Sequence, residues 1–122
     1  MQQREPIFNV PAAVVLALGL LAAVHIALSL LPERDARWWT LALAFIPARF
    51  SGFAEDLPGG TPAVLTSFVT HMLVHGDLTH LMFNSAWLLA FGGAIAQRVS
   101  GLRFFAFALL CGIAGALAFL AF

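Results

Sequence analysis

Charged residues divide this chain into alternating polar and apolar stretches. They gather at 4–5, 33–37, 49–56 and 98–103, with Asp77 standing alone. Three long apolar runs remain, from Val10 to Leu31, from about Leu78 to Ala96, and from Phe104 to Phe122. Because a helix needs about 20 apolar residues to cross the ~30 Å hydrocarbon core of a bilayer, each run predicts a transmembrane helix.

This pattern predicts an all-α, polytopic membrane protein. Its expected parts are an N-terminal segment (1–9), a first transmembrane helix (10–31), a long loop with an interfacial segment (32–66), a pre-helix and second transmembrane helix (67–97), a short link (98–103) and a third transmembrane helix (104–122). The first run exceeds the roughly 7–15 residues of a signal-peptide core, and no small-residue cleavage pattern follows it. We therefore interpret it as a retained helix.

Composition agrees with a membrane protein. Hydrophobic residues make up 61% of the chain and charged residues 10%, with a mean hydropathy of +0.94. Soluble domains contain about 45–50% apolar and about 25% charged residues. The net charge of zero argues against a nucleic-acid partner, which would require a basic surface. The lipid bilayer is the partner that this composition predicts.

The distribution of arginine suggests an orientation. All six basic residues are Arg, and two of them, Arg98 and Arg103, flank the short link. Positive charge in short segments near helix ends marks the cytoplasmic side. We expect 1–9 and 98–103 to be cytoplasmic and 32–66 to lie outside, in an integral membrane protein.

The long loop begins with a tryptophan pair, Trp38 and Trp39, followed by an apolar stretch too short to span a bilayer. Tryptophan favours the boundary between lipid and water. An interfacial helix is therefore expected, with an ordinary extracellular loop as the alternative.

Polar side chains enter the second apolar run. At 100° per residue, His71 and His75 would share one helix face, and His80 and Asn84 would share another. An amide inside a lipid span costs free energy unless it is paired. Such groups mark functional sites or join neighbouring helices, and both interpretations of Asn84 remain open.

Three chemistries could use these side chains. Zinc could bind His71, His75 and His80, but no fourth ligand is obvious and the HExxH motif is absent. Haem could bind between His25 and a histidine of the second span, without any specific supporting motif. Lastly, the His80 imidazole and the Asn84 amide could stabilise an oxyanion, which needs a nucleophile from elsewhere. We expect no cofactor.

One stretch resembles a known family. "FVTHMLVHGDLTHLMFNSAWLLAFGGAIAQR", 68–98, is similar to the second transmembrane helix of rhomboid intramembrane serine proteases, and "GLRFF", 101–105, to the start of their third. The likeness includes the H-x-x-x-N pair, His80 and Asn84. It extends more loosely over 6–122.

The resemblance implies a six-helix bundle in the bacterial inner (plasma) membrane that cleaves transmembrane proteins near the outer membrane surface. In this family a Ser in G-x-S-G on the fourth helix is the nucleophile, and a His on the sixth is the general base. Residues matching His80 and Asn84 help form the oxyanion hole. His75 matches a residue near the mouth of the active site. His71 matches a residue with a structural role.

The sequence also departs from that family. None of its five serines lies in G-x-S-G, Arg37 precedes the tryptophan pair instead of following it, and Ala96 stands where many relatives carry Glu. We expect an N-terminal part of a rhomboid protease that needs helices four to six of the same fold and is inactive alone. A non-catalytic rhomboid-like scaffold is the alternative.

Overall fold

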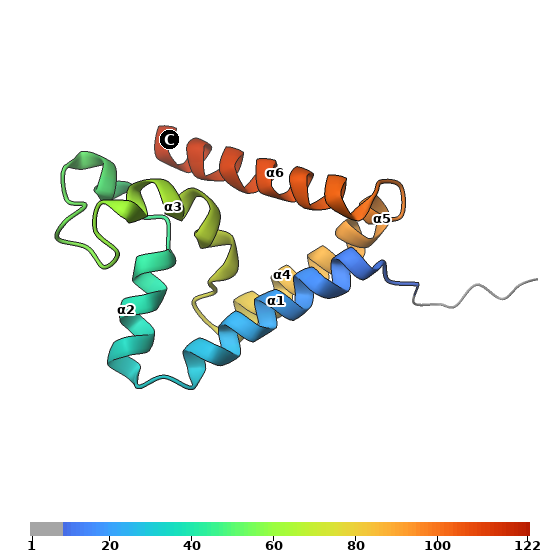
Figure 1. Ribbon diagram of the computed structural model, residues 1–122, viewed down its shortest axis with the longest axis horizontal. Helices are drawn as coiled ribbons and strands as arrows, with labels where there is room; N and C mark the ends of the chain where they lie inside the picture. Colours follow the sequence, from blue (N-terminus) through green and yellow to red (C-terminus); the bar gives the residue numbers. More distant parts are fainter. Residues whose placement is uncertain (1–8) are drawn as a thin grey trace, which may run out of the picture.

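The computed structural model describes residues 9–122, and every regular element in that range is helical (Figure 1). The elements are α1 (Ala12–Ser29), α2 (Glu33–Leu43), the 3-10 helix η1 (Pro47–Ser51), α3 (Pro62–Thr70), the 3-10 turn η2 (His71–Leu73), α4 (Leu78–Trp87), the π-helical turn η3 (Leu88–Gly92), α5 (Gly93–Ala96) and α6 (Gly101–Ala121). The expected N-terminal segment, 1–9, lies outside the described residues except for Asn9.

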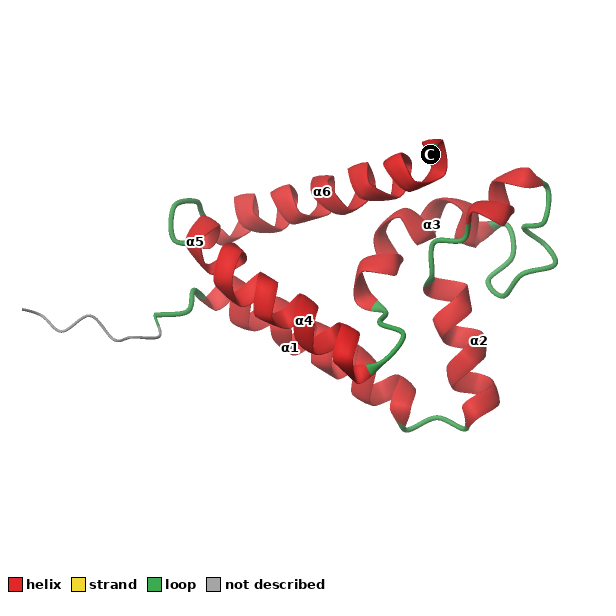
Figure 2. Cartoon of the chain, turned by 180° about the vertical axis from the view of Figure 1, so that it is seen from behind, coloured by secondary structure: helices red, strands yellow, loops and turns green. Residues whose placement is uncertain are grey.

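Three helices are long and apolar enough to cross a membrane, which confirms the predicted all-α class with three spans. They are α1, the continuous helix Leu78–Ala96 formed by α4, η3 and α5, and α6. Figures 1 and 2 show α1 beside the second span, whereas α6 diverges from them and approaches α3 near its C-terminus. The third span begins at Gly101 because the Ser100 hydroxyl accepts a hydrogen bond from the Arg103 N–H.

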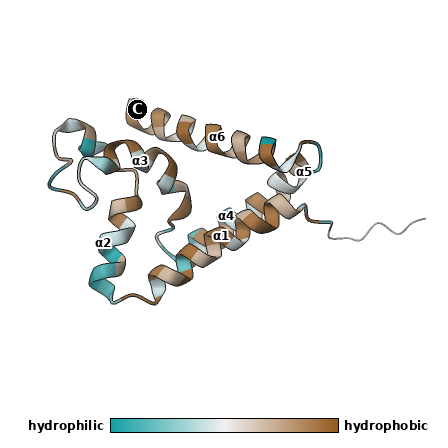
Figure 3. Cartoon of the chain, viewed as in Figure 1, coloured by the Kyte–Doolittle hydropathy of each residue, from teal (hydrophilic) through white to brown (hydrophobic). Residues whose placement is uncertain are grey.

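The buried core lies where the three spans converge. Ala13 and Val14 of α1 meet Ala96 and the Phe104 ring there. Gly92 faces this ring: a Cβ added to it would be in ordinary contact with the Phe104 ring, 3.5 Å away, and would crowd the Leu88 side chain at 2.9 Å. Away from this junction the spans expose most of their apolar side chains, as helices facing lipid do. Figure 3 shows that hydrophobic residues extend along α1 and α6.

The loop between the first two spans has a fold of its own. Arg49 Nη2 donates to the Leu41 carbonyl over 2.7 Å, and the Thr70 hydroxyl donates to the Leu43 carbonyl over the same distance. These bonds satisfy carbonyls that the last turn of α2 leaves without helical partners. We call the unit formed by α2, η1 and α3 the loop module. It also contains an aromatic group in which Phe45 contacts the rings of two further phenylalanines.

The tryptophan pair lies on α2. Trp38 and Trp39 are 46% and 49% exposed, and their rings meet edge to face 5.0 Å apart. Such half-exposed indoles suit a boundary between lipid and water. The interfacial position of α2 stays a prediction.

The chain leaves helical geometry before the second span. Helix α3 ends at Thr70, η2 follows, and Val74 is extended with φ −103° and ψ 141°. Asp77 then acts as the N-cap of α4, accepting a hydrogen bond from the His80 N–H over 2.8 Å. The expectation that His71 and His75 share a helix face is therefore wrong, because no regular helix joins them.

Candidate active site

The His80 and Asn84 side chains lie one turn apart on α4, near the end of the second span that starts at Leu78. Asp77 caps the helix through the backbone N–H of His80, which fixes the first turn. The nitrogens of the His80 imidazole are not used by this cap. Both side chains are exposed. Two N–H donors on adjacent turns of a rigid helix can therefore approach one acceptor outside the helix.

His75 precedes this helix and is buried, with 8% of its surface exposed. Its ring meets that of His80 edge to face, with centroids 5.1 Å apart. Its Nδ1 atom is buried without a hydrogen-bond partner among the described residues. Burial lowers the pKa of His75, the charges of His80 and His25 lower it further, and a backbone hydrogen bond at Leu73 acts in the opposite direction.

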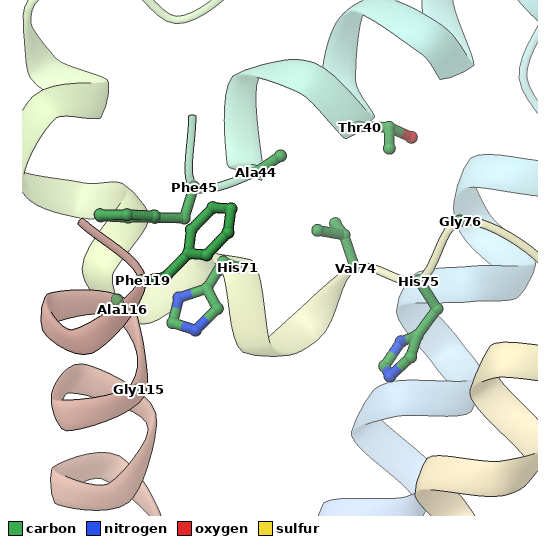
Figure 4. A pocket seen from close by; sticks show the side chains of 10 residues that line it. All are labelled: Thr40, Ala44, Phe45, His71, Val74, His75, Gly76, Gly115, Ala116 and Phe119. Atoms are coloured by element: carbon green, nitrogen blue, oxygen red, sulfur yellow. The ribbon is translucent and has the colours of Figure 1, made fainter. Parts of the chain in front are cut away.

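The charge of His25 also acts to lower the pKa of His75, a link that sequence reasoning did not make. His25 lies on α1, which packs against both η2 and α4. In Figure 4 the His75 ring is drawn beside the pale blue ribbon of α1 and the pale yellow ribbon of α4. Sequence reasoning considered His25 only as a haem ligand, because spacing along the chain does not reveal which turn of α1 faces which turn of α4.

His71 points elsewhere. Its Nδ1 lies 2.8 Å from the Ser67 carbonyl oxygen, and its ring centroid is 6.0 Å from that of Phe45. His71 and His75 line opposite sides of a cavity of about 410 Å³ between the end of α2, η2 and α6 (Figure 4). The zinc hypothesis needed His71 and His75 at one centre, which this arrangement does not provide.

Metal binding has no further support in the described part of the chain. Among residues 9–122, no group of three or more His, Cys, Asp or Glu is placed to hold a metal ion. The imidazoles of His75 and His80 instead contact each other directly. In this arrangement the two rings can take part in proton transfer and hydrogen bonding.

A family model for the rhomboid domain matches residues 62–122, which is half of the chain. The chain belongs to the rhomboid family. The matched part begins with α3 and contains η2, the second span and α6, so that it includes His75, His80 and Asn84. No curated protein and no solved structure gave a significant match.

Family membership confirms the resemblance seen in the second span. It also separates the site into two parts, because the matched residues carry the pair on α4, whereas His25 on α1 lies outside the match. The rhomboid domain therefore accounts for the helix that presents His80 and Asn84.

Proposed function

We propose that this rhomboid chain is part of an intramembrane serine endopeptidase, in which His80 and Asn84 stabilise the oxyanion of the reaction. The observation that carries the proposal is the pair itself, two exposed donors one turn apart on a capped helix within the matched domain. The substrates would be transmembrane proteins, cut near the outer membrane surface.

The proposed chemistry is acyl transfer. When a serine attacks the scissile carbonyl, negative charge develops on the carbonyl oxygen. The imidazole N–H of His80 and the amide N–H of Asn84 would donate to that oxygen, and such preorganised donors act strongly where water is excluded. His75, buried against His80, would keep the imidazole of His80 in place at the mouth of the site.

The nucleophile and the general base are not among these 122 residues. Ser85 follows Asn84 directly and is therefore rotated by about 100° away from it on the helix, and none of the serines lies in G-x-S-G. We expect both groups to come from further helices of the rhomboid fold, so that these residues alone have no protease activity.

The proposed orientation agrees with cleavage at the outer surface. With the link after Ala96 on the cytoplasmic side, the Leu78 end of the second span, which carries His80, lies towards the outside. The loop module would then lie on the outer surface, with α2 at the lipid boundary.

The first prediction tests the oxyanion pair in the complete gene product. We expect His80→Ala and Asn84→Ala each to lower kcat on a transmembrane substrate by about 10²–10³-fold, because each removes one donor. Thr79→Ala is the matched control, since Thr79 is an exposed neighbour on the same turn. Unchanged cleavage in both variants, with normal membrane insertion, would remove the assignment.

A rhomboid-like scaffold that binds transmembrane clients without cutting them is the second candidate. It is favoured by the lack of a G-x-S-G serine in this sequence. A fluorophosphonate probe applied to the complete gene product distinguishes the two candidates. Covalent labelling supports the protease, and no labelling of folded protein supports the scaffold.

A further inference from the structure

The cavity of about 410 Å³ between the end of α2, η2 and α6 has mostly apolar walls. Phe45 and Phe119 line it with their ring centroids 6.4 Å apart, and the Phe45 centroid lies 6.0 Å from that of the His71 ring. Figure 4 shows these three rings together on one side of the cavity and His75 on the other. Small-molecule sites typically have volumes of about 300–1,000 Å³. The cavity is therefore large enough to hold a small organic ligand.

Small residues keep this cavity open. Four of its lining residues are glycine or alanine, namely Ala44, Gly76, Gly115 and Ala116. On α6, a Cβ added to Gly115 would meet nothing within 4 Å. A larger side chain at Gly115 therefore has room to enter the space that a ligand would occupy.

Two polar side chains in the cavity, His71 and Thr40, have already used their protons. The His71 Nδ1 atom lies 2.8 Å from the Ser67 carbonyl oxygen, and because a carbonyl can only accept, Nδ1 carries the proton. The Nε2 atom of the neutral ring is then an acceptor. The Thr40 hydroxyl donates to the Ala36 carbonyl over 2.8 Å, which leaves only its lone pairs. A ligand that bonds to either side chain must therefore bring a donor.

The cavity offers no fixed charge to a ligand. Among residues 9–122, no carboxylate and no guanidinium lines it. Its third polar side chain, His75, is buried, and this burial lowers the pKa of His75 and so favours the neutral ring. An ammonium or carboxylate ligand would leave water without an opposite charge to meet it, which costs free energy. The lining therefore favours a neutral ligand.

We propose that this cavity binds a small neutral aromatic alcohol, whose hydroxyl donates to His71 Nε2 and whose ring packs against Phe45 and Phe119. A further ring suits this place because aromatic rings favour edge-to-face and offset contacts with one another. The proposal does not depend on the proposed function, since neither His80 nor Asn84 lines the cavity. The bound ligand would lie beside His75, whose ring is in contact with that of His80.

The test is an NMR titration of the ¹⁵N-histidine-labelled chain in detergent micelles, with phenol as the probe. We expect the ring signals of His71 and His75 to change and then to saturate as phenol is added. Anisole is the matched probe, because it has the same ring but no O–H group. Phenol should bind about 2–10-fold more tightly than anisole, which corresponds to the net contribution of one hydrogen bond.

Two variants test the position of the ligand. Gly115→Leu should fill the cavity and abolish binding of both probes, whereas Ala114→Leu, on an exposed neighbour that does not line the cavity, should leave binding unchanged. His71→Phe keeps a ring but removes the acceptor, so phenol and anisole should then bind equally. The His75 signals report binding in that variant.

Several results would overturn the proposal. A lack of saturable change with phenol, or equal binding of phenol and anisole to the wild type, rules out the hydroxyl contact with His71. Binding that persists in folded Gly115→Leu places the probe outside the cavity. Tighter binding of benzylamine or benzoate than of phenol rejects the neutral class of ligand. If His71→Phe does not fold, Gly115→Leu still decides whether the cavity is the site.

Discussion

The loop module and the three spans are held together by different forces. In the module, side chains distant in sequence bond to backbone carbonyls, as Arg49 does to Leu41 and Thr70 to Leu43. In the spans, the buried core consists of four apolar residues at the junction of the helices. The module is thus held by its own hydrogen bonds and aromatic contacts, whereas most apolar side chains of the spans remain exposed.

The difference follows from what each region must satisfy. A transmembrane helix satisfies its backbone within itself, so its contacts can be few and apolar. The short helices of the module leave terminal N–H and C=O groups without partners, and the side chains of Arg49 and Thr70 satisfy two of these carbonyls. Polar side chains in the module therefore support the fold, whereas in the spans they mark candidate sites.

The largest loss of stability is expected on substitution of Arg49 in the module. This side chain is 2% exposed, and Arg49→Ala removes its bond to Leu41 and leaves a cavity. Relief of the two buried guanidinium nitrogens that lack partners offsets part of the loss. We expect the free energy of unfolding to fall by about 2 kcal/mol.

Chemical denaturation in detergent micelles measures this change. Arg37→Ala is the control, because Arg37 is an exposed residue of α2 and should change stability by less than about 0.5 kcal/mol. Equal changes in the free energy of unfolding for the two substitutions would contradict a structural role for Arg49.

A smaller loss of stability is expected where η2, which follows the module, meets the third span. Met72 of η2 packs against Gly112 of α6 so closely that a Cβ at Gly112 would overlap its side chain. We expect Gly112→Ala to destabilise the protein by about 1–2 kcal/mol through overpacking, moderated by the flexibility of methionine. The same denaturation experiment measures it.

Gly115, one turn further along α6, provides the matched control. A Cβ added there meets nothing within 4 Å, so Gly115→Ala should cost nothing and add up to about 1 kcal/mol of helix propensity. If both substitutions change the free energy of unfolding equally, Met72 does not connect η2 to the third span.

The smallest expected effect is the pH dependence contributed by His75. Its folded pKa is lowered by burial and by neighbouring charge, so the unfolded state binds more protons than the folded state in the intervening range. Stability is therefore retained above the ordinary histidine pKa of about 6.5 and declines as the pH falls below it. His75→Gln should flatten this decline between pH 7 and 5, and an unchanged slope would refute the contribution.

The sequence was sufficient to predict features that depend on one helix at a time. The apolar runs predicted three spans, and the H-x-x-x-N spacing placed His80 and Asn84 on one face of α4. The rhomboid resemblance followed from the same stretch and is supported by the family match. Hydropathy and helical periodicity are properties of neighbours along the chain, which is why these predictions were possible.

Features that depend on contacts between helices were not predicted. The influence of the His25 charge on the pKa of His75 depends on the register of α1 against α4, which periodicity does not reveal. The break after His71 results from η2 and the Asp77 cap, although Gly76 and Asp77 were visible signals for it. Arg49 was counted as a loop charge, because its burial requires η1 to fold back on α2.

The π-helical turn from Leu88 to Gly92 changes how the two ends of the second span are oriented. A π turn holds one residue more than an α turn, so it offsets the rotational phase of everything that follows by roughly one residue, or about 100°. Without it, the side that seats Gly92 and Ala96 against Phe104 and α1 would be rotated relative to Asn84. One helix can thus dock against α1 and Phe104 at one end while the amide of Asn84 stays exposed towards the other.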